Sequence, residues 1–170
     1  MTAIVEAKNL RVIRGGSLLV DVPGLSIFEG ETLSLIGPNG AGKTTLLQAL
    51  SYLMKPSAGE ILFRGQPVGA SQGVLEYRRL LAMVFQEPLL FDTTVFNNVA
   101  SGLKIRGKGG SEARRVVEAQ LERFGIAQLG DRSAKTLSGG EAQRTSLARA
   151  FAISPAVLFL DEPFAALDPP

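Results

Sequence analysis

The sequence contains neither cysteine nor histidine among its 170 residues. Without cysteine, the chain can form no disulfide and can supply no thiolate for catalysis. Without histidine, it has no imidazole general base, no imidazole metal ligand and no histidine-based pH switch. A reducing cytosol fits the lack of cysteine. Any chemistry within this chain must therefore rest on carboxylates, amides, hydroxyls and lysine.

Long hydrophobic runs and a strong net charge are missing as well. No apolar run approaches the roughly 20 residues that cross a bilayer, and the N-terminus lacks the pattern of a secretory signal. We therefore expect any membrane role to come through a partner. The formal net charge is +2 and the basic residues are scattered, which argues against nucleic acid as the main partner. Hydrophobic residues make up 45% and charged residues 20%, as in one globular domain.

A glycine-rich stretch at residues 37–44 fits the phosphate-binding pattern G-x-x-x-x-G-K-[ST]. An apolar run before it, Thr32 to Ile36, predicts a buried strand, and Thr44 to Leu53 behind it predicts a helix with one apolar face. Glycines let a backbone curl into a nest of N–H donors, and the helix directs its positive end at the same phosphates. The context therefore predicts a nucleotide loop.

Two residues of this loop have specific predicted roles. Lys43 is expected to reach the β- and γ-phosphates, and the Thr44 hydroxyl is expected to ligate Mg²⁺. The predicted nucleotide-binding residues are Gly37, Pro38, Asn39, Gly40, Ala41, Gly42, Lys43, Thr44 and Thr45.

Strands alternate with helices along the rest of the chain, which predicts an α/β fold with a largely parallel sheet. Ser111 is expected to cap one helix and Gly125 to end it. Strands are expected at residues 4–7, 18–22, 59–65, 81–85 and 156–160, and helices at residues 94–103, 111–124 and from 137 onward.

Polar residues follow two of the apolar strands. Asp161 and Glu162 end the last strand, at the edge where α/β sheets place ligands. Asp161 suits Mg²⁺, mostly through water, and Glu162 could polarise an attacking water. Gln86 follows an earlier strand and could bond both the metal ion and a water, although plain turn chemistry explains it equally well.

A second glycine-containing helix start occurs at Ser138-Gly139-Gly140. It forms another anion nest without a neighbouring lysine. A second phosphate site that faces outward suggests a second copy of the protein.

These motifs together resemble the ATP-binding subunit of the ABC family, over the whole chain. Residues 137–144 match the signature motif of that family, residues 37–44 its Walker A loop, and residues 157–163 its Walker B strand with the catalytic glutamate. Gln86 matches its Q-loop, and residues 166–168 match its D-loop.

The resemblance implies a P-loop NTPase fold with a RecA-like core. It places a β-rich part at about residues 1–33, the core at 34–87 and 137–170, and an inserted helical subdomain at 88–136. It further implies a head-to-tail homodimer that sandwiches two ATP molecules with Mg²⁺, each between the Walker A loop of one copy and the signature of the other. The additional nucleotide-binding residues are Ser138, Gly139, Gly140, Glu141 and Asp168.

The same resemblance implies a location on the cytoplasmic face of the cell membrane. There the ATPase would move a transmembrane permease, which receives cargo indirectly from a solute-binding protein. Catalysis would rest on Glu162, Gln86 and Lys43, with Thr44, Gln86 and Asp161 at the metal.

Three features depart from the family pattern. Arg14 falls near the position of the aromatic residue that usually stacks on adenine, and a guanidinium can stack on a base instead. The switch histidine is missing, and the chain stops just after the D-loop. The strand that carries this histidine lies between the Walker A and Walker B strands, so the sheet is expected to have an unfilled centre. We expect a C-terminally truncated fragment with weak ATPase activity or none by itself.

The cargo can be inferred only from the resemblance to importers of known cargo, because the ATPase does not contact the cargo. Residues 84–99 resemble importers of oxyanions such as tungstate, molybdate or phosphate, although amino-acid and metal-chelate importers share much of this stretch. One alternative is a soluble ABC ATPase acting on ribosomes or DNA. Ribosomal types carry two such cassettes in tandem. DNA-repair types carry a long coiled coil between Walker A and the signature, whereas the stretch from Gln48 to Thr136 has no sustained heptad run. Another is a regulatory fragment that binds nucleotide without hydrolysing it.

Overall fold

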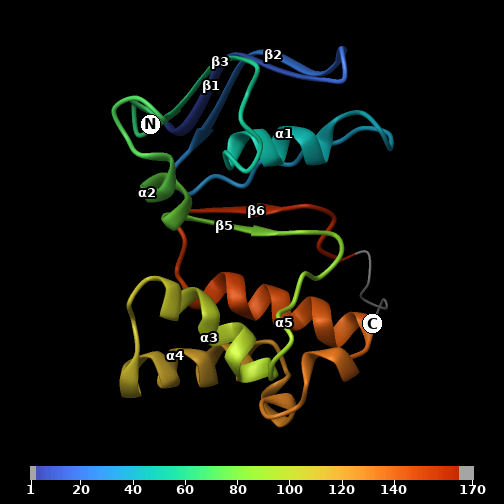
Figure 1. Cartoon of the computed structure of the whole chain (residues 1–170), viewed down its shortest axis with the longest axis vertical. Coiled ribbons are helices and arrows are strands. Elements are labelled where there is room, and N and C mark those ends of the chain that lie inside the picture. The colour runs from blue at the N-terminus through green and yellow to red at the C-terminus, as the bar shows by residue number, and fades with distance from the viewer. Residues whose placement is uncertain (1–2, 165–170) are drawn as a thin grey trace. The chain divides into compact units, whose positions relative to one another are not determined.

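The structure is a computed structural model that describes residues 3–164, and the chain divides into two units, Met1–Leu80 and Leu81–Pro170 (Figure 1). Each unit has its own secondary structure and its own buried side chains. Within the described residues, no helix is both long and apolar enough to span a membrane.

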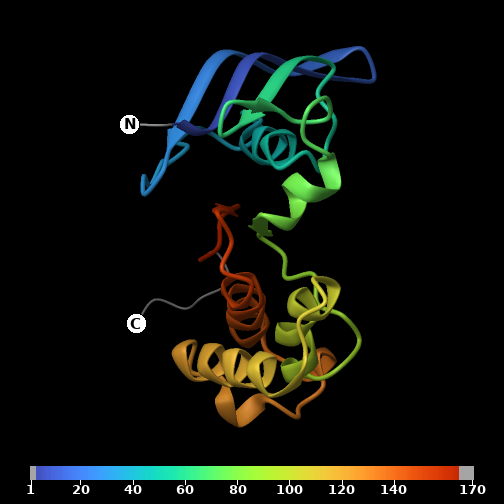
Figure 2. The ribbon, with the colours of Figure 1, turned by 90° about the vertical axis from the view of Figure 1, so that its left-hand side faces the viewer.

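The first unit is built on an antiparallel sheet with the strand order β2-β1-β3-β4. Its two long strands form a hairpin around Gly15 and Gly16, whose φ angles of 55° and 79° suit the tight turn between them. The sheet curves over helix α1 (Figure 2). The elements of this unit are β1 (Ala3–Arg14), β2 (Ser17–Phe28), α1 (Lys43–Leu50), β3 (Ala58–Phe63), β4 (Gln66–Pro67) and α2 (Val74–Arg79).

An irregularity in β1 explains why its apolar residues change phase. Val5 and Ala7 are buried before it, and Leu10 and Val12 are buried after it. The register between β1 and β3 shifts between Lys8 and Arg11, and Asn9 within this step has a φ of 48°. An extra residue at this point returns the next apolar side chains to the same face of the sheet.

Helix α2 was not predicted, and a buried tyrosine ties it to α1. The Tyr77 hydroxyl donates a hydrogen bond of 2.7 Å to the carbonyl oxygen of Leu50, and its ring meets the Phe63 ring edge-on with 5.4 Å between centroids. Burial raises the pKa of Tyr77 above its ordinary range, so the hydroxyl stays protonated and keeps this bond.

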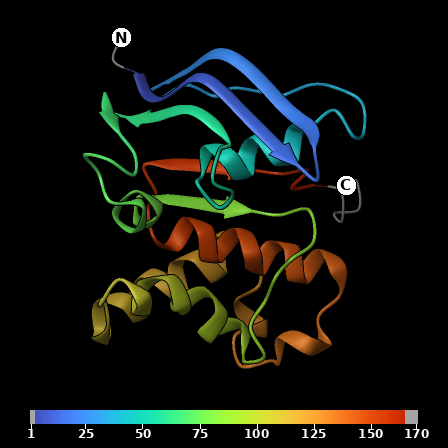
Figure 3. The same cartoon turned by 45° about the horizontal axis from the view of Figure 1, so that its top comes forward.

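The second unit combines a parallel pair of strands with a layer of helices. Strands β5 (Leu81–Val84) and β6 (Val157–Leu160) lie side by side, and α5 lies along β5 (Figure 3). Its helices are α3 (Val95–Ile105), α4 (Gly110–Arg123), the short 3-10 turns η1 (Ala127–Leu129) and η2 (Ala134–Thr136), and α5 (Gly139–Ala152).

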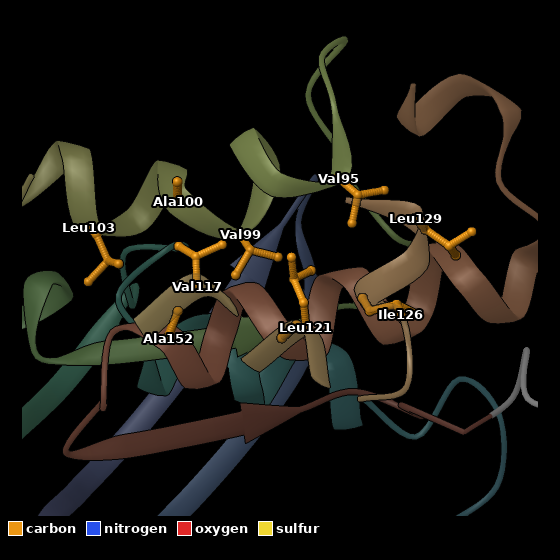
Figure 4. Close-up of a cluster of buried hydrophobic side chains, with 10 residues drawn as sticks. Val95, Val99, Ala100, Leu103, Val117, Leu121, Ile126, Leu129 and Ala152 are labelled. Atoms are coloured by element: carbon orange, nitrogen blue, oxygen red, sulfur yellow. The ribbon is translucent and has the colours of Figure 1, made fainter. Parts of the chain in front are cut away.

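The helical layer is held by one cluster of buried aliphatic side chains from α3, α4, η1 and α5 (Figure 4). Burying a valine, leucine or isoleucine side chain contributes about 1.5–3 kcal/mol relative to leaving it exposed, so the larger members of this cluster stabilise the layer. Its fully or nearly fully buried members are Val95, Val99, Ala100, Leu103, Val117, Leu121, Ile126, Leu129, Ala148 and Ala152.

Two expectations about the sheet are wrong. Residues 32–36 form no strand, and Ile36 is 96% exposed. The larger sheet is antiparallel, and β5–β6 is the one parallel pair in the part of the chain that the structure describes. A strand requires a neighbour for its backbone N–H and C=O groups, and none of the described strands pairs with residues 32–36.

Several element limits also differ from the prediction. The predicted helix to Leu53 ends at Leu50, and Leu53 is exposed. Ser111 is not a cap, since α4 begins at Gly110 with Gly109 at the cap position. Gly125, with a φ of 64°, does follow the end of α4, as its left-handed conformation requires.

Candidate functional site

The phosphate-loop residues lie in the first unit, where the backbone turns from a loop into α1. Gly40 and Gly42 have φ angles of 82° and 87°, a left-handed conformation that curls the loop. A Cβ at Gly42 would lie 2.8 Å from the carbonyl oxygen of Leu19 and 3.3 Å from a methyl group of Val20. The loop therefore needs glycine at position 42 both for its conformation and for its approach to β2.

Helix α1 begins at Lys43, and no side chain caps it. Its N-terminus carries the positive end of the helix dipole, which favours an anionic ligand. The Lys43 ammonium folds over the loop and donates hydrogen bonds to the carbonyl oxygens of Gly37 at 2.8 Å and Pro38 at 3.1 Å. Lysine and helix terminus thus concentrate positive charge at one loop.

Of the remaining predicted residues of this unit, Arg14 and Thr44 are exposed and Thr45 is half-buried. Arg14 is the last residue of β1, paired in register with Ser17. Thr44 lies in the first turn of α1 with its side chain accessible.

In the second unit, the structure brings Gln86 close to Asp161 and Glu162. Val84 and Leu160 are partners in the parallel ladder, and the N–H of Asp161 extends it by bonding the carbonyl oxygen of Val84 at 2.9 Å. Both polar segments therefore leave the same edge of the strand pair, the carboxyl edge where ligands bind in α/β proteins. Gln86 is exposed, whereas Asp161 is only 6% exposed.

Glu162 has an unusual backbone. Its φ is 45°, in the left-handed region that residues with a Cβ rarely adopt, and the side chain is exposed. Such a conformation costs on the order of 1–3 kcal/mol and persists only where surrounding contacts determine it. This conformation turns the chain sharply between Asp161 and Pro163. The Asp161 carboxylate is therefore buried while the adjacent Glu162 carboxylate is exposed.

Ser138 and its neighbours form the N-terminus of α5, as predicted. The Ser138 hydroxyl accepts the N–H of Glu141 at 3.3 Å, and a Glu141 carboxylate oxygen accepts the N–H of Ser138 at 2.7 Å. This reciprocal capping box leaves Ser138 and Gly139 exposed at the end of a 14-residue helix. These bonds, aided by nearby Arg132, lower the pKa of Glu141, so the carboxylate stays ionised there.

Sequence reasoning missed one polar residue at the centre of this unit. Gln143 is fully buried, and its side-chain nitrogen donates to the carbonyl oxygens of Phe85 at 3.3 Å and Pro163 at 3.0 Å. A signal was available, because Gln143 stands four residues before Leu147 and seven before Ala150 on the apolar face of α5. A polar residue in such a stripe needs a specific partner.

Oxygen ligands suited to a metal ion are present as individual side chains. Residues 3–164 contain no group of three or more acidic, cysteine or histidine side chains that could hold a metal among themselves. The hydroxyl of Thr44 and the carboxylate of Asp161 are ligands of the oxygen type that Mg²⁺ takes, usually beside waters and phosphate oxygens. Asp168 lies outside the described residues.

Comparisons with known proteins agree with this arrangement. The sequence profile of the family described as "ABC transporter" matches residues 20–165. The chain is 41% identical over 165 residues to the tungstate uptake system ATP-binding protein TupC of Peptoclostridium acidaminophilum, covering 97% of this chain and 74% of that protein. It is 40% identical to the sulfate/thiosulfate import ATP-binding protein CysA of Pectobacterium atrosepticum, covering 96% of this chain and 50% of that protein.

Solved structures show the same fold. The structure of cbiO1 from Clostridium perfringens, described as part of the ABC transporter complex cbiONQ, superposes with a TM-score of 0.83 at 34% identity, over 99% of this chain and 68% of that chain. The structure of a bacterial Atm1-family ABC exporter with ATP bound superposes with a TM-score of 0.84 at 28% identity, over 98% of this chain and 30% of that chain. This chain thus spans between about half and three quarters of the two curated relatives named here. The resemblance to ATP-binding subunits of importers is confirmed, and the chain belongs to the ABC transporter family.

Proposed function

We propose that this chain binds and hydrolyses ATP with Mg²⁺ and thereby energises a bacterial importer of an inorganic oxyanion. The observation that carries the nucleotide part is the loop at residues 37–42 with Lys43 folded over it at the start of α1. Backbone donors, the helix dipole and one ammonium group suit a triphosphate, and few other ligands need all three.

The residues of the matching motifs have the following proposed roles. Lys43 neutralises charge on the β- and γ-phosphates, and Thr44, Gln86 and Asp161 hold the cation. When bound, Mg²⁺ supplies charge neutralisation at the phosphates. Glu162, exposed beside the buried Asp161, accepts a proton from the attacking water. Arg14 lies against adenine by guanidinium stacking.

The signature residues would serve a second copy of the chain. Ser138, Gly139, Gly140 and Glu141 lie at an exposed helix N-terminus, which offers backbone donors to a phosphate. In a head-to-tail homodimer this terminus would close the ATP held by the partner's loop, with Asp168 near the same contact. This arrangement accounts for two anion-binding helix starts in one chain.

The segment after Gln86 is the proposed contact for the membrane permease. Leu89 and Phe91 are 61% and 55% exposed, an unusual degree for large apolar side chains. The Arg149 guanidinium holds this segment to α5 by a 2.8 Å bond to the carbonyl oxygen of Leu89, and it lies 5.8 Å from the Phe91 ring centroid. A displacement of this segment by the permease would therefore be passed directly to the signature helix. This contact would lie on the cytoplasmic face of the membrane.

The cargo is proposed to be tungstate or molybdate, received by the permease from a solute-binding protein. The similarity to the tungstate uptake protein supports this choice, while other relatives of nearly equal identity are named for sulfate, phosphate or cobalt import. Uptake of labelled molybdate, sulfate, phosphate and cobalt by cells carrying the normal protein or a Lys43→Ala variant tests it. We expect only molybdate uptake to fall, whereas loss of cobalt uptake alone would contradict the oxyanion assignment.

Hydrolysis is tested by Glu162→Gln, which keeps the size of the side chain and removes the base. We expect the turnover number to fall by about 100-fold or more while nucleotide affinity stays within about twofold, because the proposed role is confined to the chemical step. Unchanged turnover in this variant would exclude Glu162 as the base. Binding without hydrolysis in the unaltered protein would instead favour a purely regulatory nucleotide-binding chain.

A further inference from the structure

The buried amide of Gln143 contacts the two segments that carry the proposed catalytic residues. One of its acceptors is the carbonyl oxygen of Phe85, which directly precedes Gln86, and the other belongs to Pro163, which directly follows Glu162. Gln143 itself lies on α5, five residues after Ser138. One side chain therefore joins the segments next to Gln86 and Glu162 to the signature helix within the second unit.

The surroundings determine the orientation of this amide. Both neighbouring protein groups are carbonyl oxygens, so the side-chain nitrogen must face them, since only the NH₂ group can donate. The Gln143 side-chain oxygen then points away and has no hydrogen-bond partner in the described part of the chain. A glutamine placed only for stability would be expected to satisfy both ends, because buried polar groups are costly when unpaired.

The bond to Pro163 also bears on the backbone of Glu162. That residue has a φ of 45°, which needs support from neighbouring contacts. The carbonyl group of the next residue is anchored by Gln143, and the carbonyl group of Phe85 is anchored by the same nitrogen atom. Displacing α5 would therefore displace both loops together.

We propose that Gln143 is a positioning residue, which holds the Gln86 and Glu162 segments in a common register with the signature helix. This inference rests on the proposed ATPase function for its catalytic consequence. Its structural part, the tethering of both segments by one donor, stands apart from any activity and can be tested separately.

The test compares Gln143→Met and Gln143→Glu with the unaltered chain by hydrogen exchange of backbone amides. Methionine keeps the length of the side chain without a donor, and ionised glutamate places a negative charge against two carbonyl oxygens. We expect the amides of Gln86, Glu87, Leu89, Glu162 and Phe164 to exchange about tenfold faster in Gln143→Met, because loop amides that lose a tether open more readily. Exchange within α3 should stay unchanged, which shows that the unit remains folded.

Gln143→Glu supplies a readout that general loosening would not give. Protonation of the glutamate restores one donor, so protection of both segments should return as the pH is lowered, after correction for intrinsic exchange, whereas Gln143→Met should show no such recovery. Gln120→Met on α4 is the matched control, because Gln120 also has a buried side-chain oxygen but lies outside these loops. This variant should leave the amide exchange of both segments unchanged.

Steady-state kinetics test the catalytic part. In Gln143→Met we expect kcat for ATP to fall by about tenfold to a hundredfold with KM within about twofold, since misplaced groups slow the chemical step. Unchanged exchange of both segments in both variants would overturn the inference, even if ATPase activity fell. Faster exchange in a chain that never hydrolyses ATP would retain the tether and refute the proposed function instead.

Discussion

Lys43 is the residue on which nucleotide binding depends most. Its ammonium bonds two loop carbonyl oxygens, Gly37 at 2.8 Å and Pro38 at 3.1 Å, so its charge already lies over the loop. Little reorganisation is then needed for it to meet an anion. Because lysine acts as a point charge on phosphates, no neutral side chain of similar length can replace it.

We therefore predict that Lys43→Ala raises the dissociation constant for ATP by about 10- to 100-fold, the equivalent of losing one charge-assisted hydrogen bond. Titration with a fluorescent ATP analogue measures it. Lys55→Ala, which removes an exposed lysine outside the loop, is the control and should leave the affinity unchanged. Equal affinities in the two variants would refute the assignment of the loop.

At the scale of single elements, helix α5 owes its start to two residues. Ser138 and Glu141 satisfy each other's backbone N–H groups, and Arg132 lies 3.6 Å from the Glu141 carboxylate. The capping bonds to Ser138 are the main cause of the lowered pKa of Glu141. Since the folded protein favours the ionised form, Glu141 adds stability above its ordinary pKa and loses this contribution as the pH falls through the lowered pKa.

We predict that Glu141→Gln weakens the acid sensitivity of the second unit. Glutamine can still occupy the capping box, so stability near pH 7 should fall only slightly, while the loss of stability between neutral and acidic pH should become smaller. Urea unfolding followed at several pH values measures both. Glu122→Gln, an exposed glutamate on α4, should keep the pH dependence of the unaltered protein.

The sheet of the first unit depends on a close approach between β1 and β3. A Cβ at Gly59 would lie 2.2 Å from the carbonyl oxygen of Asn9, and Gly59 has a φ of 82°. Gly65, at the other end of β3, has a φ of 77° but open space around it. The two glycines therefore share a left-handed backbone conformation and differ in the steric contact that a Cβ would make.

We predict that Gly65→Ala costs about 1–2 kcal/mol of unfolding free energy from backbone strain alone. Gly59→Ala should cost more, by at least a further 1 kcal/mol or so, because the backbone at Asn9 cannot move aside without disturbing the sheet. Equilibrium denaturation of both variants measures the difference. Equal losses would show that the approach of Asn9 is not a constraint.

At the scale of the whole molecule, the proposed phosphate sites are the starts of α1 and α5, and Lys43 lies at the first of them. We predict that the Glu162→Gln variant, which should not hydrolyse ATP, forms dimers when Mg²⁺ and ATP are added. The exposed N-terminus of α5 at Ser138 would then complete the ATP site of the partner. Sedimentation velocity with and without ATP measures it. Adding Lys43→Ala to the same protein should abolish the dimer, and an ATP-independent dimer would contradict the sandwich.

Much of the chemistry could be predicted from local patterns, because each motif is a short run of residues with its own requirement. The glycines and the lysine of the first loop lie within a few positions of one another. The same is true of the residues at the start of α5 and of those at the acidic end of β6. The predicted strand at residues 32–36 failed because apolar composition indicates burial but does not identify a pairing partner. The bulge at Asn9 and the helix α2 depend likewise on neighbours distant in sequence.

By itself, the sequence determined the chemical inventory: a phosphate loop, two adjacent carboxylates, the start of the signature helix, and no cysteine or histidine. Tertiary structure alone decided that Gln86 and Glu162 leave one edge of β5 and β6, and that Gln143 joins them to α5. The reason is physical. Motifs reflect requirements between neighbours along the chain, whereas hydrogen bonds across 20 and 58 positions exist only after packing brings their donors and acceptors together.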